Sequence, residues 1–318
     1  MGRHDVSRQS IFFEPNIWLR GNAWEIKAKM NSELPDLTTM VNYRDDSNPM
    51  NIILGNTQLR NIHYYDIEGG KTFEGKKHSR LNINTGYHQT DNAVAYSLVF
   101  DKQTGVSTVQ PISVNGNYRM DLGIGYTRPL DKKEKLSIDN QASFNYNHNV
   151  DMAMVQGATQ SQRSIVNNWK ISDVLKLNYR PDDNYEFTLH GGGTYYLIKS
   201  QREGFSNIHA GDYNIGVNVQ VALPWKLQLT TDLTMFARRG YQLSEMNTTD
   251  WIWNAQLSRS FINKKLLVKL QGFDILRQLS NTQYLMNAQG RTETWNNSIP
   301  RYVMLSLSWR FNVNPKKK

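Results

Sequence analysis

The chain contains no cysteine, which excludes disulfide bonds and thiolate metal sites. This absence fits either a reducing compartment or an envelope protein that does not rely on disulfide bonds. The chain also lacks any run approaching the roughly 18 apolar residues of a membrane helix. Its first residues, MGRHDVSRQS, lack the charged and then apolar layout of a secretory signal. A hydropathy plot nevertheless detects membrane strands poorly, because it averages the apolar face and the polar face of each strand.

The motifs of common enzymes and metal sites are missing as well. The seven histidines never reach H-x-x-x-H or HExxH spacing. Neither GIGYTR nor GGGTYY forms a phosphate-binding loop, and no G-x-S-x-G occurs. Asp and Asn cluster in RDDSN and RPDDN, which we interpret as turn formers rather than calcium ligands. The sequence therefore predicts no enzyme activity, no cofactor and no metal.

The charge balance is basic, with 37 Lys and Arg against 28 Asp and Glu, a formal net charge of +9. The basic residues are scattered, and only the last three residues form a run. We interpret the excess as a diffuse polar surface and predict no nucleic-acid partner. The basic tail, residues 313–318, either touches anionic lipid headgroups or adds solubilising charge.

What the chain does contain is strict alternation of apolar and polar residues, repeated many times. In RYVMLSLSWRF one face of the expected strand is wholly apolar, and on the other face only Met304 is apolar. The apolar face consists of Val303, Leu305, Leu307, Trp309 and Phe311. Similar segments include KLQLTTDLTMFAR, YNIGVNVQVAL and NYEFTLHGGGTYYL. Helical spacing is sustained nowhere, so the sequence predicts an all-β chain.

The connections between these segments alternate in length. Short links are expected at residues 129–135, 180–184, 223–226 and 262–265, and long ones at 151–162, 199–210, 239–248 and 277–298. Outer-membrane barrels have this asymmetry, with short turns at one end and longer loops at the other. Alternating runs such as 213–223 and 184–197 span 11 to 14 residues, long enough for the 9–11 that a tilted membrane strand needs. We therefore predict an antiparallel up-and-down transmembrane β-barrel.

Three local features refine this prediction. Aromatic residues gather near the expected strand ends, including Trp225, Trp251 and Trp253; they form interface girdles or reflect the ordinary strand preference of aromatics. Asp173 falls in phase with the apolar face, so either a bulge re-aims it or it lies near a membrane interface. The segment 82–100 changes phase around TDNA, which predicts a bulge or a bend.

One stretch, ELPDLTTMVNYRDDSNPMNIILGNTQLRNIHYYDIEGG, carries more specific information. It resembles a loop-and-strand signature of TonB-dependent receptors of the Bacteroidetes outer-membrane β-barrel type, with Pro35, Pro49, Gly55, Asn56 and Leu59 in the expected order. Thr57 replaces the usual proline. Further similar segments are TDNAVAY, TGVSTVQPISVNGNY, GFDILRQ and the terminal RYVMLSLSWRFN.

The resemblance covers the chain from about residue 11. It implies that residues 11–312 form the barrel region and that residues 1–10 are the N-terminal edge of a fragment. It also implies that the GNP-type loop is external. It also implies that the terminal strand, with Val303, Leu305, Leu307, Trp309 and Phe311, is an assembly signal for the barrel-assembly machinery. A complete receptor has a signal, a plug that contacts the TonB system and about twenty-two strands. We count roughly thirteen (12–14) strands here and expect the C-terminal portion of such a barrel, in contact with outer-membrane lipid.

Function is expected to follow from the lumen and the long loops. The first hypothesis is a Gram-negative outer-membrane receptor whose parent takes up a bulky nutrient such as a metal chelate, glycan or peptide. The alternatives are a non-transporting adhesive or structural barrel, a barrel-embedded hydrolase, and a soluble β-sandwich or lipocalin-like binder. Candidate ligand contacts are the lumen residues Arg119, Asp121, Glu186, Lys226, Asp232 and Arg238 and the loop aromatics Tyr241, Tyr284 and Trp295.

Overall fold

Strands account for most of the computed structural model, which describes residues 16–20, 24–155, 157–279, 282–286, 291–295 and 299–311. The helical elements are α1 (Leu37–Met40) and two 3₁₀ turns, η1 (Pro224–Lys226) and η2 (Ser244–Met246). No helix in these ranges has the length and apolar character needed to cross a membrane.

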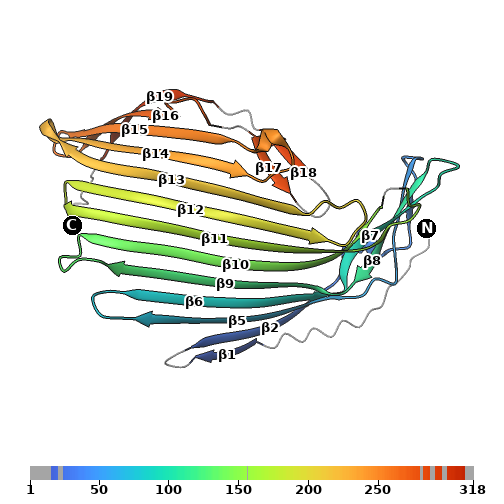
Figure 1. Ribbon diagram of the computed structural model, residues 1–318. Helices are drawn as coiled ribbons and strands as arrows, with labels where there is room; N and C mark the ends of the chain where they lie inside the picture. The colour runs from blue at the N-terminus through green and yellow to red at the C-terminus, as the bar shows by residue number, and fades with distance from the viewer. Residues whose placement is uncertain are drawn as a thin grey trace, which may run out of the picture.

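Thirteen strands form one sheet in which every neighbouring pair is antiparallel (Figure 1). The order is β1-β2-β5-β6-β9-β10-β11-β12-β13-β14-β15-β16-β19. Because direction alternates at each step, β1 and β19 run the same way, and each has one neighbour in this sheet. The strands are β1 (Asn16–Arg20), β2 (Glu25–Glu33), β5 (Ile62–Glu74), β6 (Arg80–Asp91), β9 (Asn117–Pro129), β10 (Leu136–Ala153), β11 (Gln162–Asp182), β12 (Tyr185–Ser200), β13 (Ile208–Leu223), β14 (Leu227–Arg239), β15 (Thr249–Phe261), β16 (Leu266–Phe273) and β19 (Tyr302–Trp309).

The two faces of this sheet differ sharply in polarity. Residues directly opposite each other on paired strands share a face, so the register can be followed across the sheet. One transverse row runs through Leu177, Leu189, Val217, Leu233 and Trp253. The adjacent row, on the other face, runs through Asn178, Thr188, Asn218, Asp232 and Asn254. A slip of one residue would exchange the two faces, so this alternation fixes the register.

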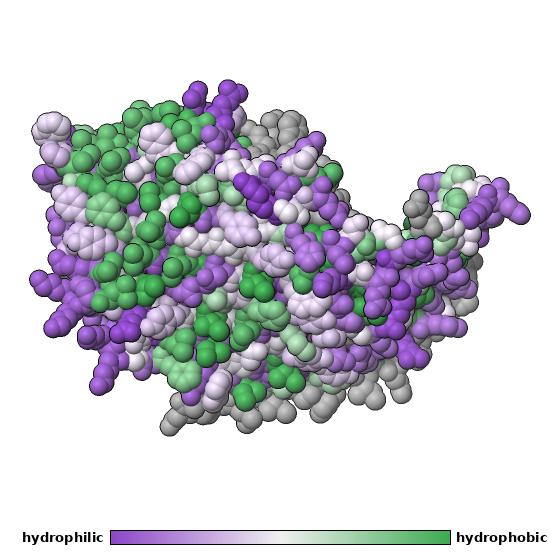
Figure 2. Space-filling model, in the orientation of Figure 1, coloured by the Kyte–Doolittle hydropathy of each residue, from purple (hydrophilic) through white to green (hydrophobic). Residues whose placement is uncertain are grey.

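The predicted alternation of connections is also observed. The predicted short links fall at tight turns, and the long loops lie at the other end of the sheet, where the last one contains the hairpin β17 (Thr282–Met286) and β18 (Arg291–Trp295) (Figure 1). Strand length was underestimated, since β10 has 18 residues and β11 has 21. Hydrophobic side chains gather mostly in the half of the molecule nearer the short turns (Figure 2).

Aromatic rings on the apolar face form a row toward the loop end. Ring centroids lie 6.0 Å apart for Tyr87 and Tyr118, 5.8 Å for Tyr118 and Tyr146, and 5.1 Å for Tyr146 and Trp169. Near the short turns a second group includes Tyr179 and Phe187, at 6.4 Å. Two aromatic zones bordering an apolar band support the girdle interpretation.

Asp173 lies on the apolar face in unbroken register with Ala142 and Gly193, so the bulge alternative is wrong. Its carboxylate is exposed and accepts a 2.7 Å hydrogen bond from Asn140 Nδ2. Asp173 stands about 33 Å along β11 from the turn at residue 183, at about 3.3 Å per residue. With a strand tilt of about 40°, that is about 25 Å above the turn, the height of the apolar band. This position agrees with the interface alternative.

The change in alternation predicted for residues 82–100 marks the point at which the chain leaves the large sheet. Strand β6 ends at Asp91, Asn92 adopts φ 57°, and the chain enters a separate four-stranded sheet. Its order is β3 (Arg44–Asp45), β4 (Asn51–Leu54), β8 (Ser107–Val114) and β7 (Ala93–Phe100), with β4 and β8 parallel. This small sheet lies at the loop end, where Leu98 N donates to Ser161 Oγ at 2.9 Å (Figure 1).

The motif residues Gly55, Asn56 and Leu59 hold the small sheet together. A Cβ on Gly55 would overlap the Val41 carbonyl oxygen, so only glycine allows this approach. Asn56 Nδ2 donates to the Pro111 carbonyl at 2.8 Å, and its Oδ1 accepts from Gln58 N at 2.9 Å. Leu59 is completely buried. These residues therefore have packing and turn roles at the base of the small sheet.

Candidate functional site

A charged cluster occupies the polar face where β5, β6 and β9 adjoin. His88 Nδ1 lies 2.6 Å from Asp66 Oδ1, and His88 Nε2 lies 3.2 Å from Asp121 Oδ1. Arg119 Nε lies 3.5 Å from the same Asp121 oxygen. The sheet register places these side chains together, because Asp66, His88 and Arg119 stand in one transverse row and Asp121 in the next.

These charged side chains lie flat against the sheet. A Cβ added to Gly86 would come within 2.7 Å of Asp121 Oδ2 and 2.8 Å of His88 Nε2. On the neighbouring strand, a Cβ on Gly123 would come within 2.6 Å of Asn84 Oδ1. Glycine on the polar face thus makes room for neighbouring polar groups to lie flat against the sheet.

A second cluster lies at the loop end of β13 and β14. Tyr241 Oη donates to Asp212 Oδ1 at 2.8 Å, and Arg238 Nε stands 3.9 Å from the same oxygen. Burial, followed by the bond to Asp212, raises the pKa of the Tyr241 hydroxyl well above its usual range. Tyr241 also packs on an apolar group formed by Val166, Ile198, Ile208 and Ala210. It anchors the 240–248 loop to the sheet.

Removing the Tyr241 hydroxyl tests this anchor. Tyr241→Phe is expected to cost about 1 kcal/mol, because Asp212 loses a charge-assisted hydrogen bond at a partly exposed site. The stabilisation that the Tyr241 hydroxyl gives the folded wild type should be complete below about pH 10. It should be lost as the pH rises further, because the hydroxyl ionises first in the unfolded chain. Hydrogen exchange of the 240–248 amides measures both effects. Equal protection in the variant and the wild type would contradict the assignment.

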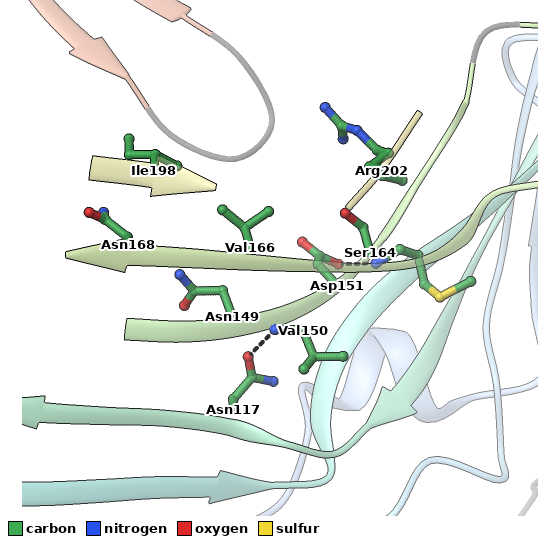
Figure 3. Close-up of a pocket in the computed structure, with 11 residues that line it drawn as sticks. Asn117, Asn149, Val150, Asp151, Ser164, Val166, Asn168, Ile198 and Arg202 are labelled. Carbon is green, nitrogen blue, oxygen red and sulfur yellow. Dashed lines mark hydrogen bonds between the residues drawn. The ribbon is translucent and has the colours of Figure 1, made fainter. Parts of the chain in front are cut away.

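A pocket of about 330 Å³ opens on the polar face where β10, β11 and β12 approach the loops (Figure 3). Its walls combine amides, one hydroxyl, two charged groups and aliphatic side chains. They include Asn117, Asn149, Val150, Asp151, Ser164, Val166, Asn168, Ile198 and Arg202. Asn117 Oδ1 accepts a 2.7 Å hydrogen bond from Val150 N, which ties β9 to β10 at the pocket edge.

Most predicted lumen residues lie on the polar face, but they do not form one site. Arg119 and Asp121 contact each other. Asp232 accepts a 2.9 Å hydrogen bond from Asn254 Nδ2. Arg238 lies beside Asp212. Glu186 stands opposite Gln220 near the short turns, and Lys226 lies in the η1 turn. Tyr284 and Trp295 belong to β17 and β18, and their side chains lie outside the described residues.

Sequence reasoning missed the residues that complete these clusters. Asp66, His88 and Asp212 stand on strands next to those of their partners, and only the register between the strands brings them side by side. The pocket was missed for the same reason, because Ser164 and Asn168 look like ordinary polar positions of an alternating strand. The available signal was their position, which is out of phase with the apolar residues Trp169 and Ile171 of the same strand.

Comparison with known proteins agrees with this architecture. Residues 158–309 match the outer membrane protein beta-barrel family, a segment that holds all of the strands from β11 to β19. No curated protein matches the chain significantly. The family match and the two-faced antiparallel sheet together establish a transmembrane β-barrel protein of the outer membrane. The apolar face is therefore the lipid face, and the polar face is the lumen wall.

Proposed function

We propose that this outer-membrane β-barrel protein is the C-terminal barrel portion of a TonB-dependent-receptor-like transporter, whose parent takes up a bulky nutrient through the lumen. The observation that carries the proposal is the width of its polar wall, thirteen strands across. Side chains fill the interior of a barrel of about eight strands, whereas wider barrels hold a channel or a plugged lumen. A wall of this width therefore suits passage of a large solute better than a purely structural role.

The conformation of the lumen charges supports transport over the adhesive or structural alternative. A structural barrel of this size would need paired charges that extend across and fill the lumen. Here Asp121 and His88 fold onto the wall over Gly86, and Asn84 folds over Gly123. A polar face whose charged and amide groups lie flat against the sheet suits a solute that crosses in contact with water and amide groups.

Entry of a large antibiotic tests this function. Expression of the parent receptor, which carries this barrel together with a plug, in a Gram-negative host is expected to lower the inhibitory concentration of vancomycin, a solute too large for general porins. The sensitisation should disappear in a host that lacks TonB, since the proposed uptake is energised through the plug. Unchanged vancomycin sensitivity at verified outer-membrane expression would favour the structural role. Sensitisation that persists without TonB would indicate a passive pore.

The partners of this receptor-like function belong to the same proposal. The terminal strand β19 presents Val303, Leu305, Leu307 and Trp309 on the lipid face, followed by the exposed Phe311. Such a two-faced aromatic end suits recognition by the barrel-assembly machinery. Contact with the TonB system would pass through a plug region.

A further inference from the structure

Two buried polar atoms line the lumen pocket with no hydrogen-bond partner among the described residues. They are Ser164 Oγ and Asn168 Oδ1, both on the lumen side of β11 (Figure 3). The Ser164 residue is only 6% exposed. Leaving a buried polar group unpaired is destabilising, and native proteins rarely tolerate it without a reason. Two such atoms in one pocket point to a molecule that supplies the missing bonds.

The spacing of the two atoms limits the shape of that molecule. Ser164 and Asn168 are four residues apart on one face of a strand, which places them about 13 Å apart. Val166 lies between them on the same face, and Ile198 of β12 stands directly opposite Asn168, so the floor from Val166 to Asn168 is aliphatic. The ligand is therefore elongated, with polar groups at both ends of an apolar middle. An extended chain of about four amino acids has this reach.

Arg202 defines one end of the ligand. It lines the pocket from the loop after β12, and it forms no ion pair with any described residue. Its guanidinium carbon lies 5.4 Å from the centre of the Phe205 ring, which holds it in place. A guanidinium fork matches a carboxylate with two parallel hydrogen bonds.

We propose that this pocket binds a short peptide, with its C-terminal carboxylate on Arg202 and its backbone amides on Ser164 and Asn168. The inference rests on the proposed uptake function and names the substrate class. A peptide supplies N–H and C=O groups along its length, and its middle residues pass beside Val166. A saccharide fits less well, because the lining residues include no aromatic ring on which a sugar would stack.

The test is binding of a defined peptide to the purified full chain in detergent. The probe is Ala-Leu-Leu-Ala carrying fluorescein at its amino terminus, read by fluorescence anisotropy. Its C-terminally amidated form should bind at least tenfold more weakly, because the Arg202 contact needs a carboxylate. Arg202→Gln should abolish this difference. Unlabelled maltotetraose should not compete with the peptide.

Ser164→Ala separates binding from folding. The variant removes an unpaired buried hydroxyl, so the free protein should be as stable as the wild type or more stable, while peptide affinity falls several-fold. Ser143→Ala, on the lumen face of β10 outside the pocket, is the matched control and should leave affinity unchanged. Absence of peptide binding, equal affinity for the acid and the amide, or displacement by maltotetraose would overturn the inference. Peptide binding without vancomycin sensitisation would instead count against the transport function alone.

Discussion

Val217→Arg is expected to destabilise the protein by about 2–4 kcal/mol, the cost of a cation on the lipid face near the bilayer midplane. Val217 lies on the apolar face of β13, opposite Leu189 and Leu233, and its side chain is 42% exposed. It stands seven residues before the turn at Pro224, about 18 Å above the turn for a tilted strand and so about 6 Å from the middle of an apolar band about 25 Å tall. An arginine there reaches no partner of opposite charge in its row.

The neighbouring position gives the matched control. Asn218 is exposed on the lumen face directly opposite Asp232, so Asn218→Arg places the same side chain beside a carboxylate in water. The change in unfolding free energy should be within about 0.5 kcal/mol. Both variants can be measured by denaturant unfolding in lipid vesicles, with the wild type alongside. Equal destabilisation by the two arginines would mean that the assignment of lipid and lumen faces is wrong.

The architecture was predictable because one rule governs every strand of a membrane barrel. Each residue of the row from Leu177 to Trp253 had to be apolar, and each residue of the next row had to be polar. That constraint acts within each strand as a two-residue alternation. It can therefore be read from the sequence without knowing which strands pair. Turn and loop positions were predictable for the same reason, since the alternation stops there.

The extensions beyond the membrane were not predictable in this way. The loop-end parts of β10 and β11 leave the apolar band, and their length follows from contact with the small sheet, through Ser161 and the cluster of Ala95, Val114 and Val150. Those contacts join residues more than thirty positions apart, and no local period reports them. Pairing of Asp66 with His88 likewise depends on register between strands. The alternation in the sequence predicts on which face of the sheet a side chain lies. Only the register between strands determines which side chain lies beside it.

Leu59→Ala is expected to cost about 2–5 kcal/mol in the small sheet, the range for truncating a buried leucine. Leu59 is 0% exposed, and Asn56 and Gly55 fix the turn that places it. The surrounding backbone is tied by hydrogen bonds from Gly55 N to the Tyr43 carbonyl and from Asn56 N to the Thr39 carbonyl. A cavity there cannot be refilled without breaking those bonds.

Leu37→Ala removes the same atoms from a side chain that is 71% exposed, so it should change stability by less than about 0.5 kcal/mol. Hydrogen exchange of the β4 and β8 amides reports the small sheet, and exchange of the β13 amides reports the membrane sheet. In Leu59→Ala the first set should exchange about thirty-fold faster or more, since about 1.4 kcal/mol corresponds to a factor of ten. The β13 amides should keep their wild-type protection, because the small sheet meets the membrane sheet at the loop ends of β10 and β11. Equal acceleration in both sets would show instead that the two sheets unfold as one unit, with Leu59 part of a core that they share.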